Sequence, residues 1–123
     1  MANIEELKQY KRIHLIGIGG VSMSGIAEIL HYWGFVVTGS DSSSSETTDK
    51  LIKNHIPVTI GHDLPNLEKA NLVVYSAAIK KDDVELVRAK ELNIPIIERG
   101  TFLGMLTKAF KNTICVSGTH GKT

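Results

Sequence analysis

Short apolar runs rich in β-branched residues recur along the whole chain. Six of them have the length of a strand and cover residues 13–16, 35–38, 58–60, 72–75, 95–97 and 113–116. Polar residues do not alternate with apolar ones inside these runs, which is typical of strands whose two faces are both covered. The pattern predicts six strands of a parallel sheet flanked by helices.

Between several of the runs the apolar spacing changes to that of an amphipathic helix. The clearest stripe has intervals of three and four and comprises Met23, Ile26, Ala27, Leu30 and Trp33. Gly34 is expected to end this helix. Another stripe comprises Phe102, Leu103, Leu106 and Phe110. A weaker helix is predicted through Val84 and Val87 after two aspartates, and a short one over residues 47–54.

The order strand, helix, strand repeats along the chain. It predicts a single α/β domain, a Rossmann-like doubly wound parallel sheet with helices on both faces and right-handed crossovers. The polar segment 39–45, with four consecutive serines, predicts a mobile loop at the carboxyl end of the second strand. Loops in that position border the ligand crevice of such sheets.

Composition narrows the class of protein. The 123 residues are 42% hydrophobic and 22% charged, with a net charge of +1, so no polybasic surface for nucleic acid is predicted. The single cysteine, Cys115, excludes an internal disulfide and fits a reducing cytoplasm, where we expect the protein to act. Because Cys115 lies in an apolar run, we expect its thiol to be buried and unreactive. We expect neither export nor membrane insertion, because no signal-like or membrane-spanning stretch occurs.

A glycine-rich loop joins the first strand to the first helix. Residues 17–25 read Gly-Ile-Gly-Gly-Val-Ser-Met-Ser-Gly, and such a loop lets a diphosphate approach the backbone and the positive end of the helix. Asp41 follows the second strand at the spacing of an acid that binds ribose hydroxyls. The dinucleotide fingerprint G-x-G-x-x-G is incomplete because Ser22 replaces its third glycine. This weakens the prediction of nicotinamide dinucleotide binding without excluding it. The alternative is that the glycines only permit a tight turn and close helix packing.

The last predicted strand leads into Ser-Gly-Thr-His-Gly-Lys-Thr at residues 117–123. This is the start of a nucleoside triphosphate loop, in which the lysine meets the phosphates and the hydroxyl holds Mg²⁺. The general pattern G-x-x-x-x-G-K-[ST] would place a glycine at position 116, where this chain has Val116. Without a following helix and a later acid, we expect no working ATP site in these residues alone, and we expect the chain to be cut at a domain boundary.

Four segments in order along nearly the whole chain resemble the Mur ligases of peptidoglycan synthesis. They are residues 17–28, 39–41, 75–79 and 117–123. The string 19–25 is most similar to that of the family member that adds alanine, and less so to a related ligase that recycles tripeptides. The resemblance implies an ATP-dependent ligase of three domains, of which residues 1–111 would be the domain that binds the UDP sugar. Residues 112–123 would begin the central ATPase domain.

The resemblance also implies roles for individual residues. UDP-N-acetylmuramic acid would place its diphosphate against Gly17, Ile18, Gly19 and Gly20 and its ribose near Ser40 and Asp41. Ser76, Ala77 and Ala78 would border the same crevice. Apart from the resemblance, Arg99 follows the fifth strand, where it could offer a planar donor fork to an anion in the crevice. The alternative is a solvated arginine at the start of a helix. In the whole enzyme, ATP would bind Gly118, Thr119, His120, Gly121, Lys122 and Thr123, and Thr123 would hold Mg²⁺. L-alanine would attack the acyl phosphate of the muramoyl carboxylate. No catalytic residue is expected within these 123 residues, so the chain alone should be inactive.

Two other functions stay open at this point. The chain could be a regulatory Rossmann module that binds NAD or another nucleotide, or a pure interaction domain, for which the glycine loop has no use. The histidines at positions 14, 31, 55 and 62 are expected in surface or packing roles, since none has a partner at metal-ligand spacing. His120 is the exception, because it lies in the terminal loop.

Overall fold

The computed structural model describes residues 9–114 and shows ten helices and strands in that range. The strands are β1 (Arg12–Ile16), β2 (Val36–Asp41), β3 (Val58–Ile60), β4 (Leu72–Tyr75) and β5 (Ile96–Glu98). The helices are α2 (Val21–Tyr32), α3 (Glu46–Lys53), α4 (Leu64–Lys69), α5 (Val84–Glu91) and α6 (Arg99–Ile114). None of the helices within residues 9–114 has both the length and the hydrophobicity of a membrane span.

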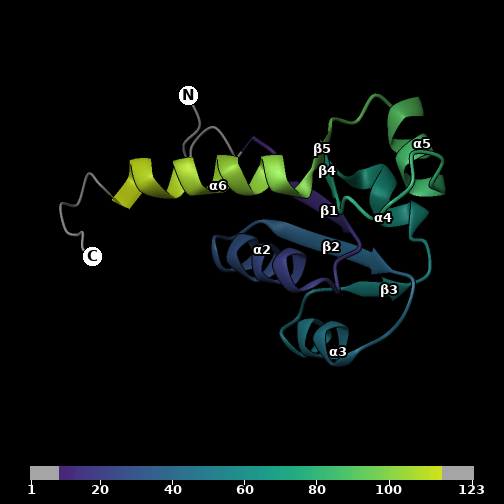
Figure 1. Ribbon diagram of the computed structural model, residues 1–123, viewed down its shortest axis with the longest axis horizontal. Coiled ribbons are helices and arrows are strands. Elements are labelled where there is room, and N and C mark those ends of the chain that lie inside the picture. Colours follow the sequence, from purple (N-terminus) through teal and green to yellow (C-terminus); the bar gives the residue numbers. More distant parts are fainter. Residues whose placement is uncertain (1–8, 115–123) are drawn as a thin grey trace.

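The five strands form one parallel sheet in the order β3-β2-β1-β4-β5 (Figure 1). The chain moves outward from β1 through β2 to β3 and then returns to the other side of β1 to build β4 and β5. This reversal leaves a crevice at the carboxyl ends of β1 and β4, where ligands bind in doubly wound sheets. The predicted fold class is confirmed.

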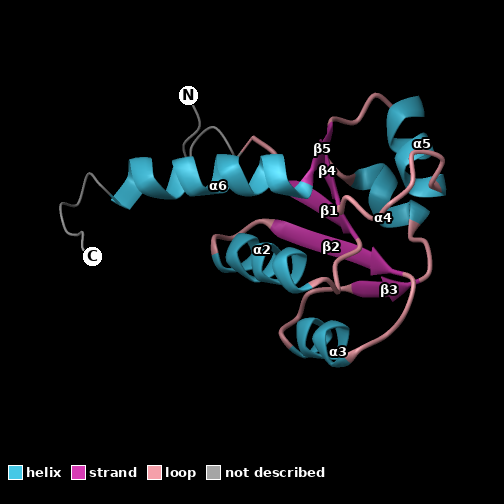
Figure 2. Ribbon diagram, viewed as in Figure 1, coloured by secondary structure: helices cyan, strands magenta, loops and turns pink. Residues whose placement is uncertain are grey.

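Helices cover both faces of the sheet, in two groups (Figure 2). On one face α2, α3 and α6 pack on alternate strand residues, in a core that includes Ile13, Leu15, Val37, Leu72 and Val74. On the other face the helices α4 and α5 pack on the remaining strand residues, in a smaller core of Ile16, Leu67, Ala70, Val73, Leu86 and Ala89. Because both faces are covered, the strands contain the continuous apolar runs seen in the sequence.

Three helices end in the same Schellman motif. In α2 the N–H of Gly34 bonds to the carbonyl of His31, and the N–H of Phe35 bonds to that of Leu30. Gly34 has φ +95°, so the predicted end of this helix is correct and follows from glycine's freedom in the left-handed region. His55 and Asn93 take the same place after α3 and α5, with φ 71° and 59°.

The sequence predictions were wrong at several points. The strand expected at 113–116 begins inside α6, which continues to Ile114, since a short apolar run cannot tell a strand from a helix and a helix satisfies its own hydrogen bonds. The segment 39–45 is not all loop, because residues 39–41 complete β2. The short helix α4 was not predicted. In α5, Val84 and Val87 are exposed, whereas Glu85, Leu86 and Ala89 are buried.

Candidate functional site

The glycine loop after β1 is fastened to the neighbouring strand β2. The backbone N–H groups of Gly17 and Ile18 both donate to the carbonyl of Ser40, at 2.8 and 3.0 Å. Gly17 has φ +84°, and the N–H of Gly20 bonds back to the Gly17 carbonyl at 3.2 Å. The loop is a tight turn that delivers the chain to the start of α2.

Gly19 and Gly20 differ in the space that a side chain would have at each position. A Cβ on Gly19 would lie 2.8 Å from Asp41 Oδ2 and 2.9 Å from Thr48 Cγ2, so packing within the domain excludes a side chain there. A Cβ on Gly20 would meet nothing closer than the Gly17 carbonyl oxygen at 3.6 Å, and its φ is −66°. The domain itself therefore does not require glycine at position 20, whereas close approach of a ligand would.

The start of α2 is electropositive. Gly20 is its N-cap, no side chain caps the helix, and its first turn contains no acidic residue. The N–H groups of that turn lack partners within the helix, and the helix dipole adds positive potential. Arg99 brings a cation to the same end, since its Nη1 donates to Ser22 Oγ at 3.0 Å. A cation beside the positive end of a helix is unfavourable alone and favourable when an anion lies between them.

Asp41 closes the other side of the loop. Its Oδ2 accepts a hydrogen bond from the N–H of Gly19 at 2.8 Å, and its Oδ1 accepts one from the N–H of Ser43 at 3.2 Å. A carboxylate has about four acceptor positions. Asp41 thus holds the loop and keeps capacity for the hydroxyl groups of a ligand.

A cleft of about 390 Å³ lies at the carboxyl ends of the strands. Of the predicted site residues, the fold brings six to its walls: Gly17, Gly20, Ser40, Asp41, Ser76 and Ala78. The others lie elsewhere. Ile18 is fully buried in the core, Gly19 packs against Asp41 behind the loop, and Ala77 is exposed outside the cleft. Arg99 is the first residue of α6, and its side chain bonds to Ser22 at the start of α2.

A buried carboxylate that the sequence analysis missed forms part of the wall. Glu85 on α5 is 1% exposed and receives hydrogen bonds from His14 Nε2 at 2.8 Å, His62 Nδ1 at 3.1 Å and Ser40 Oγ at 2.7 Å. His14, on the middle strand, also contacts Thr38 Oγ1 through Nδ1 at 2.8 Å. The Ser40 hydroxyl, predicted beside the ribose, is therefore committed to Glu85.

Hydrogen bonds lower the pKa values of two buried acids, Glu85 and Asp63. Burial alone would raise the pKa of Glu85, but the hydrogen bonds from His14, Ser40 and His62 outweigh it and lower the pKa below its ordinary value. Asp63, the N-cap of α4, behaves in the same way. Burial opposes its charge, yet hydrogen bonds from Asn66 and Thr59 lower its pKa. Both carboxylates are ionised in the folded protein at neutral pH.

One signal in the sequence pointed toward this network. His14 interrupts an apolar strand, and a buried ring needs hydrogen-bonding partners, but its partner lies 71 positions away and only the fold identifies it. The fold also brings atoms of His62, Asp83 and Glu85 within 4.8 Å of one another, which the sequence spacing did not suggest. In the described structure Nδ1 of His62 and Oε1 of Glu85 are hydrogen-bonded to each other.

Comparison with known proteins identifies the family. The profile of the Mur ligase family, catalytic domain, matches residues 12–111. The chain belongs to the Mur ligase family. A UDP-N-acetylmuramate–L-alanine ligase from Acetivibrio thermocellus is 50% identical over 98% of this chain. The chain spans about a quarter of the length of the curated relatives it matches.

Two solved structures of ligases superpose on this Mur ligase chain. That of a UDP-N-acetylmuramate–alanine ligase from Thermotoga maritima superposes with a TM-score of 0.76 at 34% identity, covering 79% of this chain and 23% of the other. That of UDP-N-acetylmuramate:L-alanyl-γ-D-glutamyl-meso-diaminopimelate ligase from Neisseria meningitides gives 0.66 at 33% identity, covering 76% and 30%. The predicted ATP-loop residues 118–123 and Cys115 lie outside the described residues.

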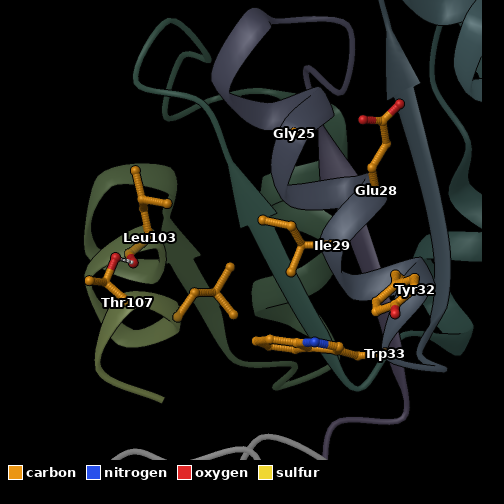
Figure 3. Close-up of a pocket in the computed structure, with 8 residues that line it drawn as sticks. Gly25, Glu28, Ile29, Tyr32, Trp33, Leu103 and Thr107 are labelled. Atoms are coloured by element: carbon orange, nitrogen blue, oxygen red, sulfur yellow. Dashed lines mark hydrogen bonds between the residues drawn. The ribbon is translucent and has the colours of Figure 1, made fainter. Parts of the chain in front are cut away.

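A larger cavity of this Mur ligase chain lies away from the glycine loop. It measures about 770 Å³ and opens between α2 and α6, where Ile29, Tyr32, Trp33 and Leu103 face it (Figure 3). Its walls are mainly hydrocarbon, and none of the described residues that line it is a lysine, an arginine or a histidine. A phosphate-bearing ligand needs such donors, so the smaller cleft at the strand ends is the candidate site.

Proposed function

We propose that this chain is the sugar-nucleotide-binding part of a UDP-N-acetylmuramate–L-alanine ligase. The observation that carries the proposal is the start of α2, where the helix end is uncapped, Gly20 is unobstructed and lines the cleft, and Arg99 bonds to Ser22. An anion is the ligand that this combination favours. The 50% identity to a ligase of that name supports the choice of substrate.

Different groups of the cleft would bind the diphosphate and the ribose of the ligand. The diphosphate would lie against the glycine loop, on the free N–H groups of the first turn of α2 and near Arg99, while the ribose hydroxyls would donate to Asp41. Ser76 and Ala78 would form the opposite wall. Ile18 would only shape the loop, because its side chain is buried in the core and its N–H is bonded to the Ser40 carbonyl. Gly19 holds Asp41 in place, and Ala77 lies outside the cleft, so both would act at a distance from the ligand.

The reaction itself would take place in the whole enzyme. ATP with Mg²⁺ would convert the muramoyl carboxylate into an acyl phosphate, which the amine of L-alanine attacks, because a carboxylate is a poor electrophile until phosphate becomes its leaving group. Residues 118–123, with Lys122 on the phosphates and Thr123 on Mg²⁺, carry this part of the proposal from the sequence pattern alone. The 123 residues would bind substrate and catalyse nothing.

The domain division and the compartment belong to the same proposal. Residues 1–111 would form the sugar-nucleotide domain and residues 112–123 the start of the ATPase domain. Helix α6 runs across that boundary to Ile114, so it would connect the two. We place the enzyme in the cytoplasm, where ATP is available.

Calorimetric titration of the chain with UDP-N-acetylmuramic acid, UDP, NAD and ATP tests the proposal. We expect saturable binding of the two UDP compounds alone. Gly20→Ala should weaken it by roughly tenfold or more, because the added methyl group stands over the amides. Gly25→Ala, on the same helix but facing the other cavity, should bind normally. Binding of NAD without a response to UDP would instead support a regulatory nucleotide-binding module.

A further inference from the structure

A single buried carboxylate contacts two histidines through different ring nitrogens. Glu85 Oε2 lies 2.8 Å from Nε2 of His14, and Oε1 lies 3.1 Å from Nδ1 of His62. The Ser40 hydroxyl donates to the same carboxylate, at 2.7 and 3.0 Å from its two oxygens. An ionised carboxylate only accepts hydrogen bonds. Each contacting ring nitrogen must therefore carry the hydrogen.

This geometry decides the tautomer of each neutral ring. A neutral imidazole has one N–H and one bare nitrogen. His14 must be the Nε2–H form, with its Nδ1 accepting from the Thr38 hydroxyl at 2.8 Å. His62 must be the opposite Nδ1–H form. Its Nε2 is then an acceptor, and among the described residues no group donates to it.

His62 is placed where a ligand can use that nitrogen. Its side chain is 51% exposed and lines the cleft together with the glycine loop. Asp41 and Asp83 line the same cleft. The cleft thus has free N–H groups at the start of α2 and carboxylate acceptors near His62, which favours the anionic part of a ligand at α2 and its N–H and O–H groups near His62.

We propose that Glu85 is a positioning residue that fixes neutral His62 as the Nδ1–H tautomer, so that Nε2 accepts a hydrogen bond from the nucleoside part of the ligand. The inference rests on the proposed function and adds a specificity-determining contact to it. Removing the charge of Glu85 would free the ring to turn or to change tautomer. The diphosphate would still bind at the glycine loop, but the nucleoside would lose one acceptor.

Histidine side-chain ¹⁵N–¹H correlation spectra at pH 8 test the first half directly. The signals are assigned with the variant His62→Gln. We expect the Nδ1–H pattern for His62 and the Nε2–H pattern for His14. In Glu85→Gln, whose amide can donate as well as accept, His62 should no longer be held in the Nδ1–H form. An Nε2–H pattern for His62 in the unsubstituted chain overturns the proposal.

Binding measurements test the second half. Glu85→Gln and His62→Gln should each weaken UDP binding by roughly five- to tenfold, the usual effect of one hydrogen bond, and leave inorganic pyrophosphate binding within about twofold. The double variant should bind UDP no more weakly than His62→Gln, because Glu85 acts through His62. Additive losses, or normal UDP binding by Glu85→Gln, overturn the proposal.

Thr38→Val is the matched control. It removes a hydrogen bond on the far side of the same network, at His14, and leaves the Glu85–His62 contact intact. UDP affinity should stay within about twofold even though the domain loses some stability. An unsubstituted chain that binds no UDP overturns the proposed function and the ligand part of this inference, whereas the spectra decide the role of Glu85 separately.

Discussion

Gly39→Ala should destabilise the domain and displace the glycine loop together. Gly39 lies in β2 outside the left-handed region, so alanine can adopt its backbone angles. The added Cβ would, however, lie 2.3 Å from Cδ1, 2.7 Å from Cβ and 2.9 Å from Cγ1 of Ile18. Carbon atoms pack at about 3.5–4.0 Å. Because the Cβ of Ile18 is involved, a new side-chain rotamer cannot relieve the contact, and the loop backbone must move by about 1 Å.

The size of the effect follows from two opposing terms. Overpacking a core costs about 1–3 kcal/mol, and a contact that reaches the backbone belongs at the upper end. Replacing glycine restricts the unfolded chain and returns about 0.4–1 kcal/mol. The net loss of unfolding free energy is therefore about 2 kcal/mol. With a urea slope of about 2 kcal/mol per molar, the midpoint of urea unfolding should fall by about 1 M.

The assay is urea unfolding at neutral pH, followed by circular dichroism. Gly104→Ala makes the same chemical change in an open position of helix α6, where a Cβ meets nothing within 4 Å, and it should stabilise by about 0.5–1 kcal/mol. In an Ile18→Ala background, Gly39→Ala should cost at least about 1 kcal/mol less than in the unsubstituted chain. A neutral Gly39→Ala, or additive effects with Ile18→Ala, would refute this account of how β2 supports the loop.

Three further predictions concern the acids, one helix end and the cation at α2. Because the folded pKa values of Glu85 and Asp63 lie below their ordinary 4.5 and 3.8, the unfolded chain binds more protons in acid, so stability should be full above about pH 5 and fall as the pH drops through 4.5 and below. Urea midpoints against pH should show this loss, with a shallower dependence in Glu85→Gln. His55→Gly should raise the unfolding free energy by about 1 kcal/mol in the same assay, since His55 takes a left-handed conformation at φ 71°, and a lower midpoint would contradict the strain argument. Arg99→Ala should weaken pyrophosphate and UDP binding by similar factors, measured by calorimetry, and a loss confined to UDP would place Arg99 away from the diphosphate.

The strands could be predicted closely from the sequence because burial on both faces leaves a continuous apolar run. Residues 58–60 and 72–75 were predicted with their observed bounds. The second strand was predicted too short, because Gly39 and the polar residues after it suggest a loop. In the structure, Gly39 is a strand residue whose missing side chain makes room for Ile18.

The helices were harder to predict where they are short or carry buried polar groups. Helix α4 has six residues and Pro65 in its first turn, too few for an apolar period to appear. In α5 the buried face includes Glu85, which a search for apolar spacing treats as surface. Reading Val84 and Val87 as the inner face was wrong for that reason.

The candidate site, like the helices, could be predicted only in part from the sequence. The position of the glycine loop and its acid Asp41 could be predicted, because a strand followed by such a loop determines where the helix begins. The network around Glu85 could not be predicted, because it joins residues from two strands, a loop and a helix that only the sheet order brings together. The sequence analysis assigned Gly17, Gly19 and Gly20 to the ligand, with a tight turn as the alternative. In the structure, packing within the domain requires glycine at position 19 and does not require it at position 20.

Backbone amide chemical-shift mapping during a titration with UDP-N-acetylmuramic acid tests the central claim most directly. The account predicts saturable shifts concentrated at the amides of residues 17–22 and around Asp41, His62 and Ser76, with little change along the cavity between α2 and α6. Shifts that gather at Tyr32, Trp33 and Leu103 while the glycine loop stays unchanged would contradict it.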